Sequence, residues 1–265
     1  MNSSPFWRGL ASMVLVGATA CGGAGSSGAG EEPASTVARE IDALADSLMR
    51  EMSAYLGEQS SFAFSSDWLE EELLDNGQKI QLGGSASVVL ERPHKLRLDL
   101  EGDERNRHIV YDGAVFAAHD PEEAVYATIE FEGTLDELLD HVAEEFGLVM
   151  PLADFLFSSP YESLVMEGTG GVYVGLHSVG GTACHHLAFM TDNVDWQIWI
   201  EAGPRPLPCK LVITYVDWAG SPQFSAVFNE WDLSPDIPED AFTFVSPEGA
   251  ERIEFFQAPA SEDPQ

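Results

Sequence analysis

Basic residues are scarce in this chain. Lysine and arginine together number 12 among 265 residues, against 45 aspartates and glutamates, so the formal net charge is −33. Proteins that bind nucleic acid, or that dock on anionic lipid through charge, need clusters of lysine and arginine. The composition therefore argues against both kinds of partner. A surface this acidic favours solubility and says nothing about the fold.

Long apolar runs and the common catalytic motifs are also missing from the sequence. No stretch approaches the ~20 apolar residues of a transmembrane helix. The sequence contains no Gly-x-Ser-x-Gly nucleophile elbow, no phosphate-binding Gly-Lys-Ser/Thr loop and no dinucleotide fingerprint. We therefore expect neither an enzyme nor a cofactor. Hydrophobic residues nevertheless make up 45% of the chain, which is enough for a substantial core.

Only three cysteines occur, and the first follows a segment typical of a secretory signal. Arg8 forms a positive n-region, residues 10–16 are mostly apolar, and small residues at 18–20 lead directly to Cys21. This arrangement resembles the lipobox of bacterial lipoproteins, in which cleavage leaves a lipidated cysteine at the new N-terminus. We expect a signal peptide over residues 1–20 and lipidation of Cys21. An ordinary signal peptide cut nearby, with Cys21 incidental, is the alternative.

The residues after Cys21 are typical of a flexible tether. Residues 22–30 contain only Gly, Ala and Ser. We expect the lipidated cysteine and tether to occupy residues 21–34, the folded domain residues 35–257, and a disordered tail residues 258–265. The attached lipid would then be the only membrane anchor. Gly22 directly after the cysteine suits delivery to the outer membrane, as the lipobox resemblance implies.

Two helices can be predicted from local patterns. Apolar residues recur on one face over residues 36–56, which predicts an amphipathic helix. Thr134 and Glu137 have the spacing of a capping box, and Gly147 is placed to end the helix that follows. Short apolar stretches at 150–157 and 161–166 suit brief helices packed across a sheet.

Most of the remaining chain alternates between apolar and polar residues, as half-buried strands do. We count about ten to eleven strands, and their short connections make neighbouring strands antiparallel. An antiparallel sheet of this size should curl rather than stay flat. The predicted fold is therefore α+β: a strongly curved antiparallel sheet, or open half-barrel, with a helical lid over an apolar cavity.

Several motifs resemble those of the lipoprotein-carrier superfamily, which includes the LolA, LolB and LppX-type carriers. Arg92-Pro93 followed by Arg97 resembles its RP motif, and residues 111–115 resemble its Asp-Gly hairpin. Residues 242–250 resemble its C-terminal Phe-x-Phe-x-x-Pro-x-Gly motif. The stretches 186–189, 195–200 and 206–215 resemble, more closely, a family of predicted periplasmic proteins of unknown function within that superfamily.

The resemblance implies binding of acyl chains or another hydrophobic ligand beneath the lid. It implies that Arg92 tethers the lid and helps gate the cavity; a surface ion pair worth under ~1 kcal/mol is the alternative for this residue. The residues expected to contact the ligand are Phe64, Leu98, Leu138, Phe155, Trp196, Ile198, Tyr215 and Phe228. A soluble shuttle is not lipid-anchored, so Cys21 points to a resident or receptor-like role in the periplasm. A structural or interaction protein of the envelope, with a self-filled core, is the alternative, and an envelope protein partner would fit it.

The histidines and the other two cysteines give no clear site. His185 and His186 are adjacent on a strand and point to opposite faces, and His177 with His186 would need a third metal ligand that no spacing supplies. Cys184 and Cys209 open strands that flank a third strand. Strands two apart are ~9.6 Å from one another, which disfavours a disulfide. Export to an oxidising compartment favours one, so the pairing stays open.

Overall fold

The computed structural model describes residues 39–148, 150 and 152–255. Within these residues, twelve strands form one open sheet, in which β12 pairs with β6 in parallel and the other neighbours are antiparallel. In their order across the sheet the strands are β12 (Glu251–Ile253), β6 (Val125–Glu130), β5 (Val115–Asp120), β4 (Arg107–Tyr111), β3 (Lys95–Gly102), β2 (Lys79–Glu91), β1 (Ser61–Leu73), β11 (Gln223–Asp232), β10 (Pro208–Tyr215), β9 (Val194–Glu201), β8 (Thr182–Met190) and β7 (Gly170–Val179).

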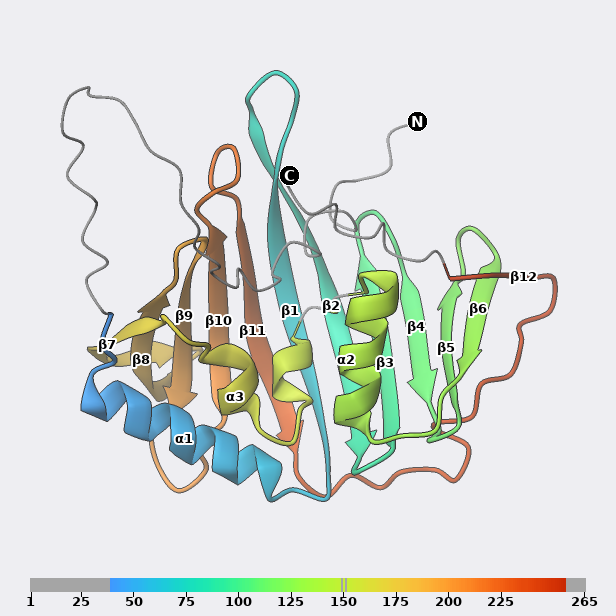
Figure 1. Cartoon of the computed structure of the whole chain (residues 1–265), viewed down its shortest axis with the longest axis horizontal. Helices are drawn as coiled ribbons and strands as arrows, with labels where there is room; N and C mark the ends of the chain where they lie inside the picture. The colour runs from blue at the N-terminus through green and yellow to red at the C-terminus, as the bar shows by residue number, and fades with distance from the viewer. Residues whose placement is uncertain (1–38, 149, 151, 256–265) are drawn as a thin grey trace, which may run out of the picture.

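The helices lie together over one face of the curved sheet (Figure 1). They are α1 (Ala43–Gly57), α2 (Leu135–Phe146), the short 3₁₀ helix η3 (Ala153–Phe155) and α3 (Pro160–Leu164). We call the sheet face beneath them the inner face; Phe64, Leu98 and Ile198 lie on it. The predicted α+β fold, an open antiparallel sheet with helices across one side, is confirmed. The strand count is twelve because β12 adds a strand that alternation does not reveal.

The first helix begins later than the sequence pattern predicts. Its first helical residue is Ala43, and the Asp42 side chain accepts a hydrogen bond of 2.8 Å from the Leu44 amide. The preceding backbone pairs with the start of β7, where the Asp42 amide donates to the Gly171 carbonyl at 2.8 Å. The prediction that the helix starts at residue 36 is therefore wrong, because pairing with β7 and the Asp42 cap hold residues 40–42 out of the helix.

The second helix forms as predicted. The Thr134 side chain accepts from the Glu137 amide while the Glu137 carboxylate accepts from the Thr134 amide, which completes the capping box. Gly147 ends the helix in the left-handed conformation at φ 64°, where a residue without a Cβ pays no steric penalty. α2 is thereby fixed at both ends over the inner face.

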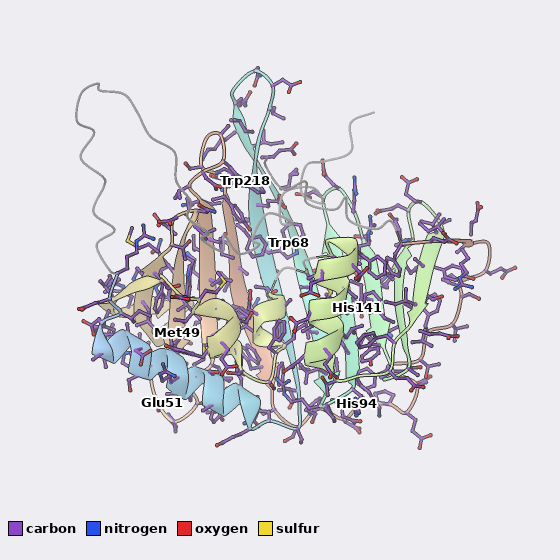
Figure 2. The ribbon with its side chains drawn as sticks, viewed as in Figure 1. Met49, Glu51, Trp68, His94, His141 and Trp218 are labelled. Atoms are coloured by element: carbon purple, nitrogen blue, oxygen red, sulfur yellow. The ribbon has the colours of Figure 1, made fainter. Side chains whose placement is uncertain are left out.

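One apolar cluster fills the space between the helices and the sheet. Figure 2 shows Met49 on the side of α1 toward the sheet and Glu51 on the opposite side. Met49 is fully buried and Glu51 is exposed. Alternate strand residues share a face, and those on the inner face of the sheet belong to the same cluster as the buried helix residues. Burial of this cluster is the main stabilising contribution to the fold.

The chain after β11 covers part of the opposite, outer face. The Arg97 guanidinium donates to the Ala241 carbonyl at 3.5 Å, and Lys95 lies 5.6 Å from the Phe242 ring centroid. The rings of Tyr126 and Phe244 are 5.3 Å apart. Figure 1 shows this segment passing around the sheet to β12 at its edge. The carrier-like C-terminal motif therefore packs against the outer face of β3–β6.

Three sequence-based expectations lie outside the described residues: the signal peptide over 1–20, lipidated Cys21 with its tether over 21–34, and the tail over 258–265. No described helix is both long enough and apolar enough to cross a membrane.

Candidate functional site

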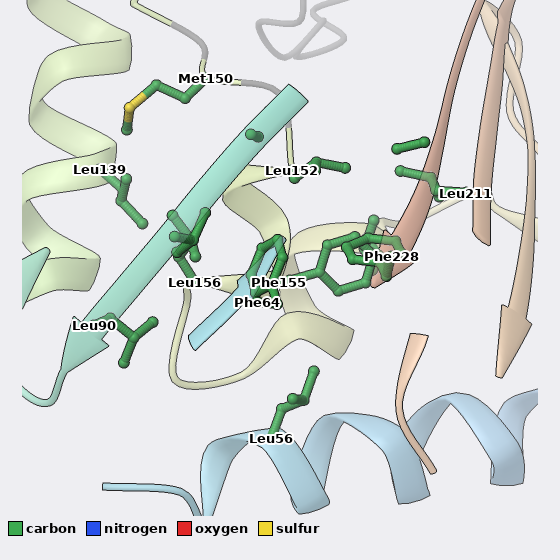
Figure 3. Close-up of a cluster of buried hydrophobic side chains, with 14 of the residues drawn as sticks. Leu56, Phe64, Leu90, Leu139, Met150, Leu152, Phe155, Leu156, Leu211 and Phe228 are labelled. Carbon is green, nitrogen blue, oxygen red and sulfur yellow. The ribbon is translucent and has the colours of Figure 1, made fainter. Parts of the chain in front are cut away.

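The eight residues expected to contact a ligand come together on the inner face and its lid. Seven of them belong to the buried cluster: Phe64, Leu98, Leu138, Phe155, Trp196, Ile198 and Phe228. Tyr215 is half-buried and packs against that cluster. Figure 3 shows Phe64, Phe155 and Phe228 close together. The Phe228 ring centroid lies 5.5 Å from that of Phe64 and 5.1 Å from that of Phe155, edge-on in the second case.

Phe155 belongs to a lid segment, which we define as residues 152–165, comprising η3, α3 and the loop between them. Arg92, directly after β2, holds this segment to the sheet. Its Nη1 donates to the Leu156 carbonyl at 2.9 Å and its Nη2 to the Phe157 carbonyl at 2.8 Å. The guanidinium thus forms the two-pronged contact that suits arginine better than lysine. Burial lowers the pKa of Arg92, and nearby Asp136 opposes that effect.

A second tie joins the lid segment to α2. The Ser158 amide donates to the Asp136 carboxylate at 2.9 Å, and the Ser158 hydroxyl donates to the same carboxylate. Asp136 lies in the first turn of α2, where a negative charge is also favoured by the helix dipole. The loop between η3 and α3 is therefore held from two directions, by Arg92 and by Asp136.

A third tie joins α3 to α1. The Tyr161 hydroxyl donates to the Asp46 carboxylate and accepts from Arg50 Nη2 at 2.7 Å. The Arg50 guanidinium also lies over the Tyr161 ring, 3.9 Å from its centroid, and the Tyr161 amide donates to the Ser53 hydroxyl at 3.0 Å. Polar contacts thus hold the lid segment around its border, while Phe155 and Leu156 pack into the apolar cluster.

The inner face becomes polar along β1. Ser66, Trp68 and Glu70 occupy successive positions on the same side of the strand as Phe62 and Phe64, by alternation. Burial, together with the charges of Glu72 and Glu104, raises the pKa of Glu70 to about 7. Burial also raises the pKa of Tyr215 to about 12, with the carboxyl groups of Glu70 and Asp154 adding to the effect.

The described residues also form a cavity of about 450 Å³ away from the lid segment. It lies at the β6–β12 edge beside α2 and is lined by Thr128, Ile129, Phe146, Arg252, Ile253, Glu254 and Phe255. None of the eight expected ligand residues lines it. Phe155 and Leu156 of the lid segment are themselves buried in the apolar cluster.

Comparison with protein families decides the membership of this chain. Residues 45–256, which include β1–β12 and nearly all of α1, match the family described as "Predicted periplasmic protein (DUF2092)". The chain belongs to this family. The sequence resemblance to a family of predicted periplasmic proteins is therefore confirmed. A comparison with curated proteins finds no match.

Solved structures to which this chain is similar include a mycobacterial lipoprotein, the mycobacterial protein LprF and a member of the LolA superfamily. Mycobacterium tuberculosis lipoprotein LppX is 11% identical, covering 73% of this chain and 97% of its own, with a TM-score of 0.42. LprF from Mycobacterium bovis is 9% identical, covering 80% and 100%, with a TM-score of 0.40. A LolA superfamily protein from Nitrosomonas europaea is 11% identical, covering 76% and 97%, with a TM-score of 0.35.

The histidines stay on opposite faces, as strand alternation predicts. His185 contacts Tyr173 with a 3.2 Å hydrogen bond, whereas His186 stacks on Trp199 with ring centroids 4.0 Å apart. His177 and His186 do lie on paired strands, with their Nδ1 atoms 3.0 Å apart. Within the described part of the chain, no group of three or more His, Cys, Asp or Glu side chains is placed to hold a metal ion.

Cys184 and Cys209 are both free thiols on strands that flank β9. Burial raises the pKa of each thiol, most strongly that of Cys209. Because the thiolate is the reactive form, we expect iodoacetamide at pH 8 to alkylate them at least ~10-fold more slowly in the folded protein than in urea. The measurement uses a Cys21→Ser chain, so that only these two cysteines are counted. Equal rates in the two conditions, or a missing thiol titre in urea, would contradict the structure.

Glu70 should make stability fall as pH rises. Its folded pKa of about 7 lies above the ordinary value of 4.5, so the folded state binds more protons between these values. Below pH ~4.5 the Glu70 carboxyl is protonated in both states and does not lower the stability of the fold. The destabilisation caused by its ionisation grows as the pH rises toward 8. After allowance for solvent screening we expect this cost to be about 1–2 kcal/mol. In urea denaturation, the free energy of unfolding of Glu70→Gln should therefore equal that of wild type at pH 4.5 and exceed it at pH 8. The exposed control Glu123→Gln should have the free energy of unfolding of wild type at both pH values. A constant difference between Glu70→Gln and wild type across that range would refute the assignment.

Apart from Arg92, the polar residues around the lid segment were not anticipated from the sequence. Asp136 reads as an ordinary acidic residue in the first turn of a helix, and Tyr161 as one more aromatic. Ser66, Trp68 and Glu70 do carry a usable signal, because they continue the alternation of Phe62 and Phe64 and so share their face.

Proposed function

We propose that this protein is a cell-envelope lipoprotein that binds a hydrophobic ligand, the acyl chain of a lipid or lipoprotein, between the inner face and the lid segment. The eight inner-face and lid residues named above contact the ligand, and Arg92 gates its entry. Cys21 anchors the protein to the outer membrane through attached lipid, with the tether holding the domain away from the surface. The protein acts by binding and performs no catalysis.

The observation that carries this proposal is the way the lid segment is attached. Its apolar side chains face the cluster, but its border is held by separate polar contacts from Arg92, Asp136 and Asp46. Such contacts exchange readily with water at a rim, whereas a continuous core does not. A segment held in this way can move as a unit and leave the sheet intact.

The energies of ligand and lid are compatible with such exchange. Each hydrogen bond from a charged group contributes about 1.5–3 kcal/mol to holding the lid segment. Burial of an acyl chain gains about 0.8 kcal/mol per methylene, hence on the order of 10 kcal/mol for a chain of ordinary length. An entering chain would therefore offset the loss of the Arg92 contacts and replace part of the apolar packing of Phe155.

A reversible lock on the lid segment tests the proposal. Asp136 and Ser158 touch across the gap between α2 and the lid, so Asp136→Cys with Ser158→Cys places two thiols there. In a Cys21→Ser chain, we expect a fluorescent fatty acid to bind saturably when this pair is reduced and to be excluded when it is oxidised. The single variants, treated with the same oxidant, serve as controls. Absence of saturable binding in the reduced state would sink the proposal.

A second function is favoured by the edge of the sheet. β7 is an edge strand whose Val172, Val174 and Leu176 side chains are exposed. Beyond Gly171, where residues 40–42 pair with it, this edge has no strand partner among the described residues. Exposed apolar residues on such an edge suit contact with another protein. This observation favours a structural or interaction protein of the envelope with a self-filled core. Binding of no lipid, in either state of the lock, would make it the better account.

A further inference from the structure

Four buried side-chain polar atoms of the described residues have no hydrogen-bond partner, and two of them, Ser66 Oγ and Trp68 Nε1, lie two residues apart on β1. Ser66 is 1% exposed, and neither its hydroxyl nor the buried indole Nε1 of Trp68 has a hydrogen-bond partner among the described residues. Burial of a polar group without a hydrogen bond is unfavourable, because the group loses its bonds to water and gains none within the protein. Native proteins satisfy most such groups, so two on neighbouring inner-face positions of one strand need an explanation.

These two positions lie next to the expected acyl site. Ser66 is directly opposite Phe228 in the β1–β11 pairing, and Phe228 touches both Phe64 and Phe155 of the lid segment. Trp68 follows two residues later, about 7 Å farther along the strand. The apolar floor beneath the lid therefore continues directly into the two unpartnered groups.

The sheet makes room for the Trp68 indole. Trp68 is opposite Gly84 of β2, and a Cβ added at Gly84 would lie 2.5 Å from Trp68 Cζ2. A Cβ added at Gly102 of β3 would lie 2.9 Å from the same atom. Two glycines on adjacent strands thus form a cradle for the ring, which fixes where its N–H lies. Figure 2 shows Trp68 at the sheet, above the helices.

The surroundings define the chemistry that would satisfy these groups. The indole N–H only donates, and the serine hydroxyl both donates and accepts, so the missing partner must offer acceptor oxygens. The next inner-face residue is the carboxyl of Glu70, and the Asp154 carboxyl lies on η3 beside Phe155. Burial raises the pKa of both carboxyls, that of Glu70 to about 7, so these surroundings disfavour a negative charge. The same burial would disfavour a phosphate or carboxylate group on a ligand, whereas an ester or hydroxyl carries no charge.

We infer that Ser66 and Trp68 form the polar end of the ligand site, where the hydroxyl and the indole N–H bind the ester oxygens of an uncharged acyl lipid. This inference rests on the proposed function and adds to it the class of ligand. The acyl chains lie along Phe64, Phe155 and Phe228, and the ester group lies where β1 becomes polar.

The test compares two uncharged lipids that differ at the ester. The probes are dioleoylglycerol and its diether analogue, which lacks the carbonyl oxygens, each titrated into the exported Cys21→Ser chain purified without detergent. We expect wild type to bind the diester about tenfold more tightly than the diether. Trp68→Phe and Ser66→Ala should each lose most of that preference while binding the diether unchanged. Trp231→Phe is the matched control, because its indole already donates to the Pro208 carbonyl at 3.0 Å.

A second measurement needs no mutation in the site. The indole N–H resonance of Trp68, assigned by its loss in Trp68→Phe, should shift downfield on addition of the diester and not of the diether. Equal affinity for the two lipids, an unmoved resonance, or tighter binding of oleate anion than of the diester would overturn the inference while leaving acyl binding itself intact. Failure of wild type to bind any of the three lipids would overturn the proposed function with it.

Discussion

Replacement of Arg92 by alanine should lower the free energy of unfolding by about 2–4 kcal/mol. The guanidinium makes two hydrogen bonds to lid carbonyls, at 2.9 and 2.8 Å, and a hydrogen bond to a charged group contributes about 1.5–3 kcal/mol. Alanine also leaves the Leu156 and Phe157 carbonyls without these donors. Urea denaturation followed by circular dichroism measures the loss. Arg92→Lys should recover only part of it, because a single ammonium does not reproduce the fork.

Arg97 supplies the matched control for this prediction. It lies in the same motif and pairs with Asp99 at 2.7 Å, but its side chain is 41% exposed. An exposed ion pair contributes under ~1 kcal/mol, so Arg97→Ala should have a small effect. A decrease in the free energy of unfolding that is as small for Arg92→Ala as for Arg97→Ala would show that Arg92 is an ordinary surface residue. It would remove the structural basis for its role at the lid.

Replacement of Phe155 by alanine should lower the free energy of unfolding by about 3–5 kcal/mol, the usual range for a buried phenylalanine. Phe155 is fully buried and its ring meets that of Phe228 edge-on at 5.1 Å. Figure 3 shows Phe155 beside Phe64 and Phe228 within the cluster. The same urea titration measures the change.

The effect of a fatty acid on the stability of Phe155→Ala distinguishes a ligand-binding protein from one with a self-filled core. If a ligand takes the place of the ring, Phe155→Ala should regain much of the lost stability when a fatty acid is added, since a ligand stabilises the state that binds it. Leu44 is exposed, so the free energy of unfolding of Leu44→Ala should fall by under about 1 kcal/mol, and added fatty acid should not restore it. A large loss in Phe155→Ala that fatty acid does not restore would indicate a permanent, self-filled core.

The parts of the fold that were predictable are those set by neighbouring residues. The capping box of Thr134 and Glu137 and the stop at Gly147 are local, and α2 begins and ends where they indicate. Strand alternation also accounts for the opposite faces of Trp196 and Trp199: Trp196 is buried in the cluster, while Trp199 stacks on His186 outside it. Which of these faces is the inner one depends on where the helices pack, and no strand pattern contains that information.

The parts that were missed depend on contacts between distant segments. The start of α1 is set by the pairing of Asp42 with Gly171, and β12 is three residues long, too short to show a period. In the candidate site, the sequence resemblance pointed to Arg92 at the lid, and the structure shows its contacts with two lid carbonyls. The contact between Tyr161 and Asp46 joins residues 115 positions apart, beyond the reach of any local pattern.

Native mass spectrometry with lipid extraction tests whether a hydrophobic ligand occupies the space beneath the lid segment. The sample is the exported Cys21→Ser chain purified without detergent, a change that removes any lipid attached at that cysteine. We predict one co-purified acyl lipid per chain. When the Asp136→Cys, Ser158→Cys variant is delipidated, oxidised and then offered the lipid again, we predict that it binds none. A wild-type protein that is empty as purified, and that also fails to take up a fluorescent fatty acid, would contradict the account.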